Sequence, residues 1–354
     1  MSKRKITIKL LTKSALIRLT VLLSLIGILS IWGWSMVIFM PGKSYAGELP
    51  PLTPAEQLLK KELLQDIQTL AGEIGEHNYA FPKQLAASEQ FLSRSLSEAG
   101  YQVNRQTYRV DGQEFHNLEV EIKGSKKPDE IVVIGAHYDS VVGSPGANDN
   151  GSGAAAVLAL ARAFAVEKPD SASAPLPDRT LRFVEFVNEE PPFFWTENMG
   201  SLVYAKGCYE RQENIVAMLS LETMGYYSDA PGSQQYPLGL LDTIYPITGN
   251  FIAFIGNISS GNLVREVVGN FRSHTQFPSE GTALPSNVPG AGWSDHWAFW
   301  QMGYPALMVT DTAPFRYPHY HTMEDTPDKV DGDRLARVVA GIERVIHHLV
   351  SLSQ

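Results

Sequence analysis

Several apolar stretches of this chain end directly in histidine or acidic residues, and this pattern restricts the fold more than any other feature. Residues 131–136 run into His137 and Asp139, and residues 181–187 run into Glu189 and Glu190. Short, continuously apolar runs are typical of strands that are buried on both faces of a sheet. Open α/β sheets place their ligand sites at the carboxyl ends of such strands. The sequence therefore predicts a cluster of histidine and carboxylate side chains at one sheet edge.

The remaining strand ends follow the same rule. Glu222 directly follows residues 217–221. Residues 305–309 precede Asp311 and a loop that contains His319 and His321. Each of these residues is a metal-ligand type, and one or two of them alone would be ordinary buried polar groups. Five such features, all histidine or carboxylate, indicate a functional site.

Strands alternate with helices along residues 55–354, a pattern typical of α/β proteins. Apolar spacing predicts strands at 102–110, 117–123, 131–136, 181–187, 217–221, 251–255 and 305–309. It predicts helices at 55–74, 83–99, 151–167, 201–211, 261–274 and 331–352, with a loop rich in Pro, Ser and Ala at 171–178. We therefore predict one α/β domain with a mixed, largely parallel central sheet and helices on both faces.

The N-terminus predicts a membrane segment. Residues 19–40 carry no charge and are long enough, as a helix, to cross the roughly 30 Å hydrocarbon core of a bilayer. The preceding residues 1–18 are basic, so we expect them on the cytoplasmic side, with a linker at 41–54 and the catalytic domain at 55–354 outside the cytoplasm, in the periplasm or the extracellular space. The rival interpretation is a cleaved signal and a secreted protein, because Ser44-Tyr45-Ala46 before Gly47 resembles a signal-peptidase site.

Charge and cysteine content exclude several functions. The net charge is −9, but the first 40 residues hold six of the 29 Lys and Arg and no acid, which leaves 23 bases against 38 acids, or −15, for the rest. A domain with this negative charge repels the phosphate backbone of nucleic acids, so we expect no nucleic-acid partner. The single cysteine, Cys208, excludes an internal disulfide and a cysteine-based zinc site. A bound metal must therefore be held by histidines and carboxylates.

Two local patterns refine the expected site. His137 and Asp139 are two residues apart in an extended chain, so their side chains point to the same side and Asp139 can orient a metal-binding histidine. Asp149 lies in a turn-forming run immediately before a helix, where an aspartate is equally well explained as an N-cap.

Taken in order, the motifs resemble those of the M28 family of zinc peptidases. They are His137-x-Asp139, Gly-Ala-Asn-Asp149-Asn-Gly-Ser-Gly, Asn-Glu189-Glu190, Leu-Glu222-Thr-Met-Gly, Ser-Asp295-His-x-x-Phe and His321-Thr-x-x-Asp325-Thr. The resemblance covers about residues 55–350 and implies two co-catalytic zinc ions at the strand ends. It also implies a cis peptide between Asp149 and Asn150.

The resemblance further implies a role for each residue. Asp149 would bridge the two metals, one of which would add Glu190 and His321, and the other His137 and Glu222. Glu189 would be the general base, with Asp139 supporting His137. The sequence departs from the family at Glu222, where the family often has an aspartate. This metal set and base would hydrolyse an amide bond without a covalent intermediate.

The expected substrate is a peptide or amino-acid amide with a free amino group, which suits an acidic two-metal site, so an aminopeptidase is the leading prediction. Aromatic residues flank the ligands and either line an apolar pocket or pack the loops together; they are Phe193, Phe194, Trp195, Trp293, Trp297, Trp300, Phe315 and Tyr317. Two alternatives remain. Glutaminyl cyclases resemble the same motif set but use one zinc, and non-catalytic relatives use the fold as an interaction module.

Overall fold

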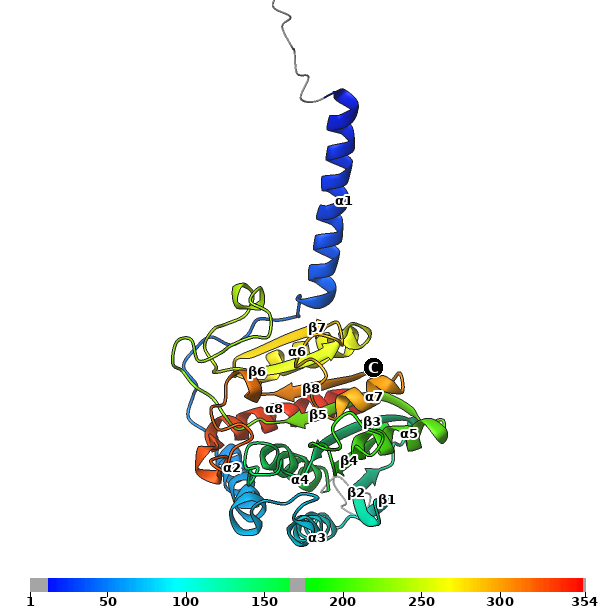
Figure 1. Cartoon of the computed structure of the whole chain (residues 1–354), viewed down its shortest axis with the longest axis vertical. Coiled ribbons are helices and arrows are strands. Elements are labelled where there is room, and N and C mark those ends of the chain that lie inside the picture. The colour runs from blue at the N-terminus through cyan, green and yellow to red at the C-terminus, as the bar shows by residue number, and fades with distance from the viewer. Residues whose placement is uncertain (1–11, 166–175, 353–354) are drawn as a thin grey trace, which may run out of the picture.

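The computed structural model describes residues 12–165 and 176–352. Within these ranges the chain forms one eight-stranded sheet in the order β1-β2-β4-β3-β5-β8-β6-β7 (Figure 1). The strands are β1 (Asn104–Val110), β2 (Gln113–Ile122), β3 (Lys127–His137), β4 (Arg179–Phe186), β5 (Asn214–Glu222), β6 (Ile252–Asn257), β7 (Ser279–Leu284) and β8 (Ala306–Thr310).

The middle of the sheet is parallel and its edges are mixed. Strands β4, β3, β5 and β8 run parallel to one another, so their carboxyl ends meet at one edge. The hairpin of β1 and β2 is antiparallel and joins β4 in antiparallel orientation. At the other end β6 is antiparallel to β8, and β7 is parallel to β6. The predicted mixed, largely parallel sheet is therefore confirmed.

Helices cover both faces of the sheet, as predicted. One face carries α2 (Pro54–Ile67), α3 (Pro82–Glu98), α4 (Gly151–Ala165), α6 (Gly261–His274) and α8 (Gly332–Val350), whose apolar side chains share one core cluster. The other face carries α5 (Gly200–Glu210) and α7 (His296–Gln301), which pack in a second cluster. A seven-residue π-helix, Gln68–Ile74, continues α2 and completes the helix predicted at 55–74.

Sequence periodicity explains how these helices pack. In α8 the buried residues Leu335, Val338, Val339 and Ile342 recur at helical spacing and form one apolar stripe facing the core. In α4 the first turn lies against β5 so closely that a Cβ at Gly153 would sit 2.2 Å from the Leu221 carbonyl oxygen. Glycine at this position therefore lets the residues before α4 approach the end of β5.

The structure adds elements that the sequence pattern did not predict. Strand β7, with the sequence SEGTAL, has no clear alternation, and α7 is only six residues long, too short for a recognisable period. Strands β2, β3 and β5 begin three or four residues before the predicted starts, because their polar first residues pair with neighbouring strands. The predicted end of the helix at 151–167 and residues 171–175 of the predicted loop lie outside the described residues.

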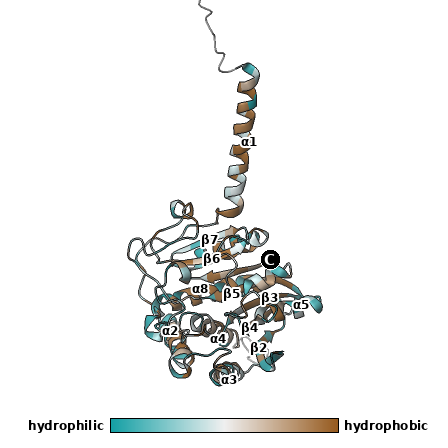
Figure 2. Ribbon diagram, viewed as in Figure 1, coloured by the Kyte–Doolittle hydropathy of each residue, from teal (hydrophilic) through white to brown (hydrophobic). Residues whose placement is uncertain are grey.

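The N-terminal helix α1 (Lys13–Val37) projects away from the domain and is apolar along most of its length (Figures 1 and 2). It is the one described helix long and apolar enough to cross a membrane, and none of its residues is buried. Its 25 residues span about 37 Å, more than the hydrocarbon core of a bilayer. The helix thus begins six residues before the predicted uncharged span at 19–40 and includes Lys13 and Arg18, while residues 1–11 of the predicted basic segment lie outside the described part.

The helix ends at Val37, three residues before the end of the predicted span, and the chain then packs on the domain. Met40 is buried in the main core cluster. The guanidinium group of Arg272 donates to the carbonyl oxygen of Pro41 at 3.3 Å, and the Ser44 hydroxyl accepts from the amide of Ser279 at 2.9 Å. The first part of the predicted linker at 41–54 is therefore fixed to α6 and β7.

Candidate metal centre and active site

Three predicted ligands meet where β3, β5 and the loop before α4 come together. The Nε2 atom of His137 lies 3.5 Å from Asp149 Oδ1 and 3.3 Å from Glu222 Oε2. One donor atom from each residue lies within 4.8 Å of the others, and all three side chains are buried. We call His137, Asp149 and Glu222 the inner triplet. The longer glutamate side chain at 222 therefore still reaches the group.

A second group shares Asp149 and lies towards the surface. The Nε2 atom of His321 lies 3.0 Å from Asp149 Oδ2 and 3.4 Å from Glu190 Oε1. The donor atoms of these residues again lie within 4.8 Å of one another. We call Asp149, Glu190 and His321 the outer triplet. The two oxygens of Asp149 thus face one triplet each, which is the arrangement that a bridging carboxylate requires.

Glu189 lies beside both triplets, and its Oε2 is 3.8 Å from His137 Nε2. The carboxylate of Asp139 accepts hydrogen bonds from the main-chain amides of Glu189 at 3.1 Å and Glu190 at 3.2 Å. Asp139 therefore fixes the main chain of the glutamate pair.

The sequence placed the Asp139 carboxylate against the imidazole of His137, and the contact differs from that expectation. The His137 Nδ1 donates to the main-chain oxygen of Asp139 at 2.9 Å, whereas the carboxylate is 3.7 Å away. Because a carbonyl oxygen can only accept, the proton sits on Nδ1 and the Nε2 lone pair is left facing the inner triplet. The main chain of Asp139 orients the ring.

Left-handed backbone conformations occur at or next to three of the predicted ligands. Asn188, which precedes the glutamate pair, has φ of 60°, Thr223 after Glu222 has φ of 43°, and His321 has φ of 59°. Non-glycine residues adopt this left-handed region only where surrounding contacts hold them, and such residues gather at functional sites. The peptide between Asp149 and Asn150 is cis, as the resemblance implies.

The loop that carries Asp149 is held by a carboxylate from the far end of the chain. The side chain of Asp325 accepts from the amides of Asn148 at 2.9 Å and Asp149 at 3.0 Å, and from the Tyr317 hydroxyl at 2.8 Å. Asp311 accepts from the side-chain amide of Asn148 at 2.9 Å. Asp311 and Asp325 thus position Asp149 rather than join either triplet.

Charges in the buried site shift several pKa values. Burial and the negative charge of Asp149 raise the pKa of Glu190 to about 7, and burial with the charges of Glu190 and Glu222 raises that of Glu189 well above its usual range. Burial would lower the pKa of His321, but Asp149 and Glu190 outweigh it and raise this pKa to about 10. Burial would raise the pKa of Asp149, but the two flanking imidazoles outweigh it and lower this pKa.

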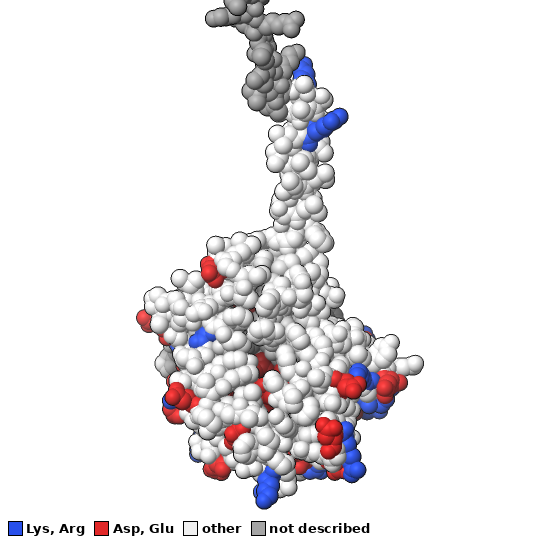
Figure 3. All heavy atoms as spheres, viewed as in Figure 1, with Lys and Arg blue, Asp and Glu red and all other residues white. Residues whose placement is uncertain are grey.

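The donor set fits divalent metal ions. Neither His137 Nε2 nor Glu190 Oε1 has a hydrogen-bond partner within the described ranges, although both atoms are buried. A buried polar atom without a partner is costly, and several carboxylates this close repel one another unless cations neutralise them. Figure 3 shows acidic side chains at the floor of a hollow in the middle of the domain, at the level where β5 ends in Figure 1. Imidazole and carboxylate donors without thiolate suit zinc.

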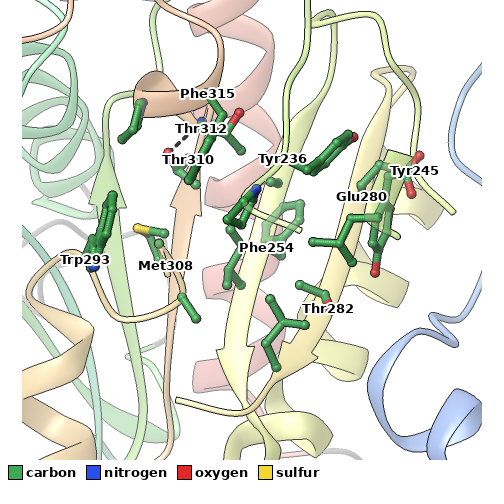
Figure 4. A pocket seen from close by; sticks show the side chains of 18 of the residues that line it. Tyr236, Tyr245, Phe254, Glu280, Thr282, Trp293, Met308, Thr310, Thr312 and Phe315 are labelled. Atoms are coloured by element: carbon green, nitrogen blue, oxygen red, sulfur yellow. Dashed lines mark hydrogen bonds between the residues drawn. The ribbon is translucent and has the colours of Figure 1, made fainter. Parts of the chain in front are cut away.

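An apolar pocket adjoins the inner triplet (Figure 4). Its cavity volume is about 90 Å³, and Glu222 and Tyr320 are among the residues that line it. Figure 4 shows Trp293 and Met308 on one side and Tyr236 and Tyr245 on the other. The Tyr320 ring stacks on His321 with centroids 3.8 Å apart. The pocket therefore offers an apolar surface directly beside the expected metals.

The flanking aromatic residues divide between the two roles that the sequence left open. Trp293 and Phe315 line the pocket and stack on each other with centroids 6.2 Å apart. Trp195 instead stacks between Phe194 and Trp297, and Trp300 packs against the second core cluster. Of the remaining two, Phe193 contacts Phe115 of β2 and Tyr317 contacts Tyr226 of the loop after β5.

Four other histidine and acidic residues lie outside both triplets. Asp295 is fully buried at the N-cap of α7, and His296 is buried with Nε2 2.8 Å from the Ala291 carbonyl oxygen. His319 pairs with Glu324 at 2.9 Å, and His274 is exposed.

Sequence reasoning missed three groups that position the ligands. Ser294 donates to Glu222 Oε2 at 2.7 Å. The side chain of Asn150 bridges the Leu221 carbonyl and the Thr223 amide, both at 2.9 Å. Asp325 stood in a quoted motif without an assigned role. Nothing in local spacing marks such contacts, because their partners are more than 70 residues away along the chain.

Comparison with known proteins agrees with this geometry. The sequence model of peptidase family M28 matches residues 117–346. The protein YfbL of Escherichia coli strain K12, which is uncharacterized, is 34% identical over 272 residues, 75% of this chain and 80% of YfbL. A probable leucine aminopeptidase of Trichophyton verrucosum strain HKI 0517 is 26% identical over 299 residues, 80% of this chain and 72% of that protein.

Solved structures show the same fold. The zinc aminopeptidase BSAP from Bacillus subtilis superposes with a TM-score of 0.65 at 15% identity, covering 83% of this chain and 95% of that one. A glutaminyl cyclase from Fimbriiglobus ruber gives a TM-score of 0.60 at 19% identity, covering 86% and 97%. At these identities the likeness concerns the fold alone.

The fold and the histidine–carboxylate site define a metallopeptidase of the zinc aminopeptidase architecture. The family match covers more than half of the chain, so the protein belongs to peptidase family M28. The predicted family and the predicted enzyme class, a zinc metallopeptidase, are therefore confirmed.

Proposed function

We propose that the protein is a two-zinc aminopeptidase that is anchored in a membrane with its catalytic domain outside the cytoplasm. The observation that carries the proposal is the pair of triplets that share Asp149, with Glu189 beside both. His137 and Glu222 would hold one ion, Glu190 and His321 the other, and Asp149 both. When bound, zinc polarises the scissile carbonyl and makes a water molecule nucleophilic at neutral pH.

Glu189 is the residue that we assign to proton transfer. It lies within reach of both triplets but belongs to neither, and the hydrogen bond from its main-chain amide to the Asp139 carboxylate fixes its main chain. Its carboxylate takes the proton of the attacking water and delivers it to the leaving amine. Since Glu189 is buried, bulk water does not compete for that proton.

The apolar pocket supports an N-terminal specificity. The pocket, which Glu222 and Tyr236 help to line, would hold an apolar side chain of the first residue of the substrate. The carboxylates of the two triplets would attract its free amino group. The Trichophyton relative is named a probable leucine aminopeptidase, which agrees with an apolar first residue. The fold is shared with a glutaminyl cyclase, so cyclisation of N-terminal glutamine is the second candidate.

Packing of the N-terminal segment supports retention of the anchor. Cleavage before Gly47 would remove Met40, Pro41 and Ser44, which pack against α6 and β7. We therefore expect the full chain to stay in the membrane fraction after a carbonate wash. Recovery of a mature form that begins at Gly47 would instead favour the cleaved signal.

The decisive experiment combines metal analysis with turnover. The purified full chain should hold about two zinc ions and hydrolyse amides of apolar amino acids. Glu189→Gln keeps the shape of the side chain and removes its basicity, so turnover should fall by roughly 10²–10⁴-fold with metal content unchanged. Glu190→Gln is the matched control, since it should lose metal as well as activity.

Other outcomes would redirect the assignment. If Glu189→Gln lost metal but kept its activity per bound ion, the roles of the two glutamates would be exchanged. One tightly bound zinc ion and turnover of glutaminyl peptides alone would favour the cyclase. A metal-loaded chain that turned over neither substrate would favour a non-catalytic interaction module.

A further inference from the structure

The connection between β5 and β6 contains a loop with two different faces. Residues 236–247 turn Tyr236, Leu241 and Tyr245 towards the apolar pocket. The opposite face exposes Leu238 at 45%, Leu240 at 70% and Ile247 at 51% of their surface. The only charged residue among these twelve is Asp242. The exposed face is therefore apolar, whereas the inner face belongs to the active-site pocket.

This loop and the end of α1 are fixed to neighbouring residues of the same edge strand. The Tyr245 hydroxyl donates to the Gly281 carbonyl oxygen at 3.1 Å, and the Thr282 hydroxyl donates to the Val37 carbonyl oxygen at 3.3 Å. A Cβ at Gly281 would lie 3.0 Å from the side chain of Met40, so the segment after α1 also packs there. Figure 1 shows the loop at the level where α1 meets the domain.

The surroundings of the loop select a lipid surface over water. The side chains of α1 are exposed and apolar, and this helix leaves the domain next to the loop. On the face in view, Figure 3 shows a largely uncharged surface below α1, with one acidic side chain on the projecting loop. Transfer of exposed leucine and isoleucine side chains from water to the boundary between headgroups and acyl chains of a bilayer lowers their free energy.

We propose that loop 236–247 rests in the interface of the bilayer that α1 spans, as a second hydrophobic contact beside the anchor. The proposal rests on the anchor in the proposed function. The contact is hydrophobic, because Leu238, Leu240 and Ile247 carry it and the loop has no basic residue. A zwitterionic membrane is therefore sufficient. Since Tyr236, Leu241 and Tyr245 belong to the same loop, the active-site pocket and the bilayer share one wall.

A single labelled cysteine tests the contact in the full chain. The native Cys208 is buried, so an introduced surface cysteine should label selectively, with the parent chain as the labelling blank. The variant Leu240→Cys is labelled at the new cysteine with a polarity-sensitive fluorophore and reconstituted into phosphatidylcholine proteoliposomes. Glu98→Cys is the matched control, because Glu98 is exposed on α3, at the end of the domain opposite α1. The probe at 240 should shift to the blue and be quenched by headgroup-labelled lipid, whereas the probe at 98 should do neither.

Each outcome decides between the loop and the anchor. Flotation of the vesicles with a water-exposed probe at 240 would overturn the loop contact and leave the anchor intact. Failure of the full chain to float would overturn both. Since the contact is hydrophobic, adding anionic lipid or raising the salt should leave the signal unchanged. A signal that required anionic lipid would also overturn the proposal.

Discussion

The two triplets share Asp149 but differ in how the fold supports them. In the inner triplet, His137 ends β3 and Glu222 ends β5, and these strands are paired in the sheet. In the outer triplet, His321 lies in the irregular segment between β8 and α8, and its side chain is 32% exposed, whereas that of His137 is fully buried. Ligands on paired strands are fixed by the sheet, whereas a loop ligand depends on its local contacts.

The comparison therefore predicts two unequal metal sites. The inner ligands are buried and two of them end paired strands, whereas His321 of the outer triplet is partly exposed and stacks on Tyr320. Rigid, buried ligands lose little entropy on binding, while an exposed ligand must be ordered first. The inner ion should bind more tightly than the outer ion.

The largest effect should come from the shared carboxylate. Asp149→Ala removes one ligand from each triplet, so zinc content should fall from about two ions to nearly none, and activity should be lost with it. Elemental analysis after exhaustive dialysis measures the content. Glu185→Gln is the matched control, because Glu185 is a buried carboxylate outside both triplets that makes no hydrogen bond to the Asp149 loop. One ion retained with unchanged affinity in Asp149→Ala would show that Asp149 serves a single site.

A pair of histidine variants separates the two sites. His321→Ala should lower the affinity for the outer ion by more than the roughly 10–100-fold that is typical of losing a residue that only supports a ligand. The inner ion should stay bound. His137→Ala should release the inner ion, and it should destabilise the fold because it leaves Glu222 as a buried carboxylate without its imidazole partner.

Stepwise removal of zinc by a chelator measures the two affinities in the native chain. The ion lost first should be the one that is missing in His321→Ala. Simultaneous loss of both ions with a single affinity would remove the distinction between a buried and a partly exposed site.

The pH dependence of zinc binding sharpens the description of the outer site. Without metal, His321 has a pKa of about 10 and Glu190 of about 7, so at neutral pH His321 holds a proton that zinc must displace, and Glu190 holds one in about half of the molecules. Zinc affinity should therefore rise with pH, by about tenfold per pH unit for each displaced proton. Competition with a chromophoric chelator between pH 6 and pH 8 measures this slope. The slope should decrease by one proton in His321→Ala, and an unchanged slope would contradict the assigned proton.

The smallest effect concerns a carboxylate outside both triplets. Glu185 on β4 is fully buried, and neither oxygen has a hydrogen-bond partner among the described residues. Burial and the nearby charges of Asp295 and Asp66 raise its pKa well above the usual range. The folded protein therefore holds a proton that the unfolded chain releases above its ordinary pKa of about 4.3.

This proton determines how the free energy of unfolding changes with pH. Stability is full below that unfolded pKa and declines as the pH rises towards the folded pKa. In Glu185→Gln the free energy of unfolding of the metal-free protein should fall less steeply with pH, by up to about 1.4 kcal/mol per pH unit. Urea unfolding between pH 5 and pH 8 tests it. Equal slopes in both proteins would show that Glu185 is charged in the fold.

Local patterning was enough to predict most of the sheet and its two helical layers. Continuous apolar runs, as in β3 and β4, mark burial on both faces, and burial of this kind is a property of a single segment. Strand β7 and helix α7 were not predicted, because β7 has no clear alternation and α7 is too short to show a period. Contacts with neighbouring elements hold both in place. The strand-end rule placed His137, Glu189, Glu190 and Glu222 at one edge before any contact was known.

The sequence by itself determined the chemical types at the site, namely imidazole and carboxylate without thiolate, and the order in which they occur. Only the tertiary structure decided which oxygen of Asp149 faces which triplet, that Asp325 holds the Asp149 loop, and that residues 40–44 pack on the domain. Periodicity encodes local burial, because each residue's exposure depends on its own segment. Contacts such as that of Asp325 with Asp149 join residues 176 positions apart, and they form only when the whole sheet and its loops fold together.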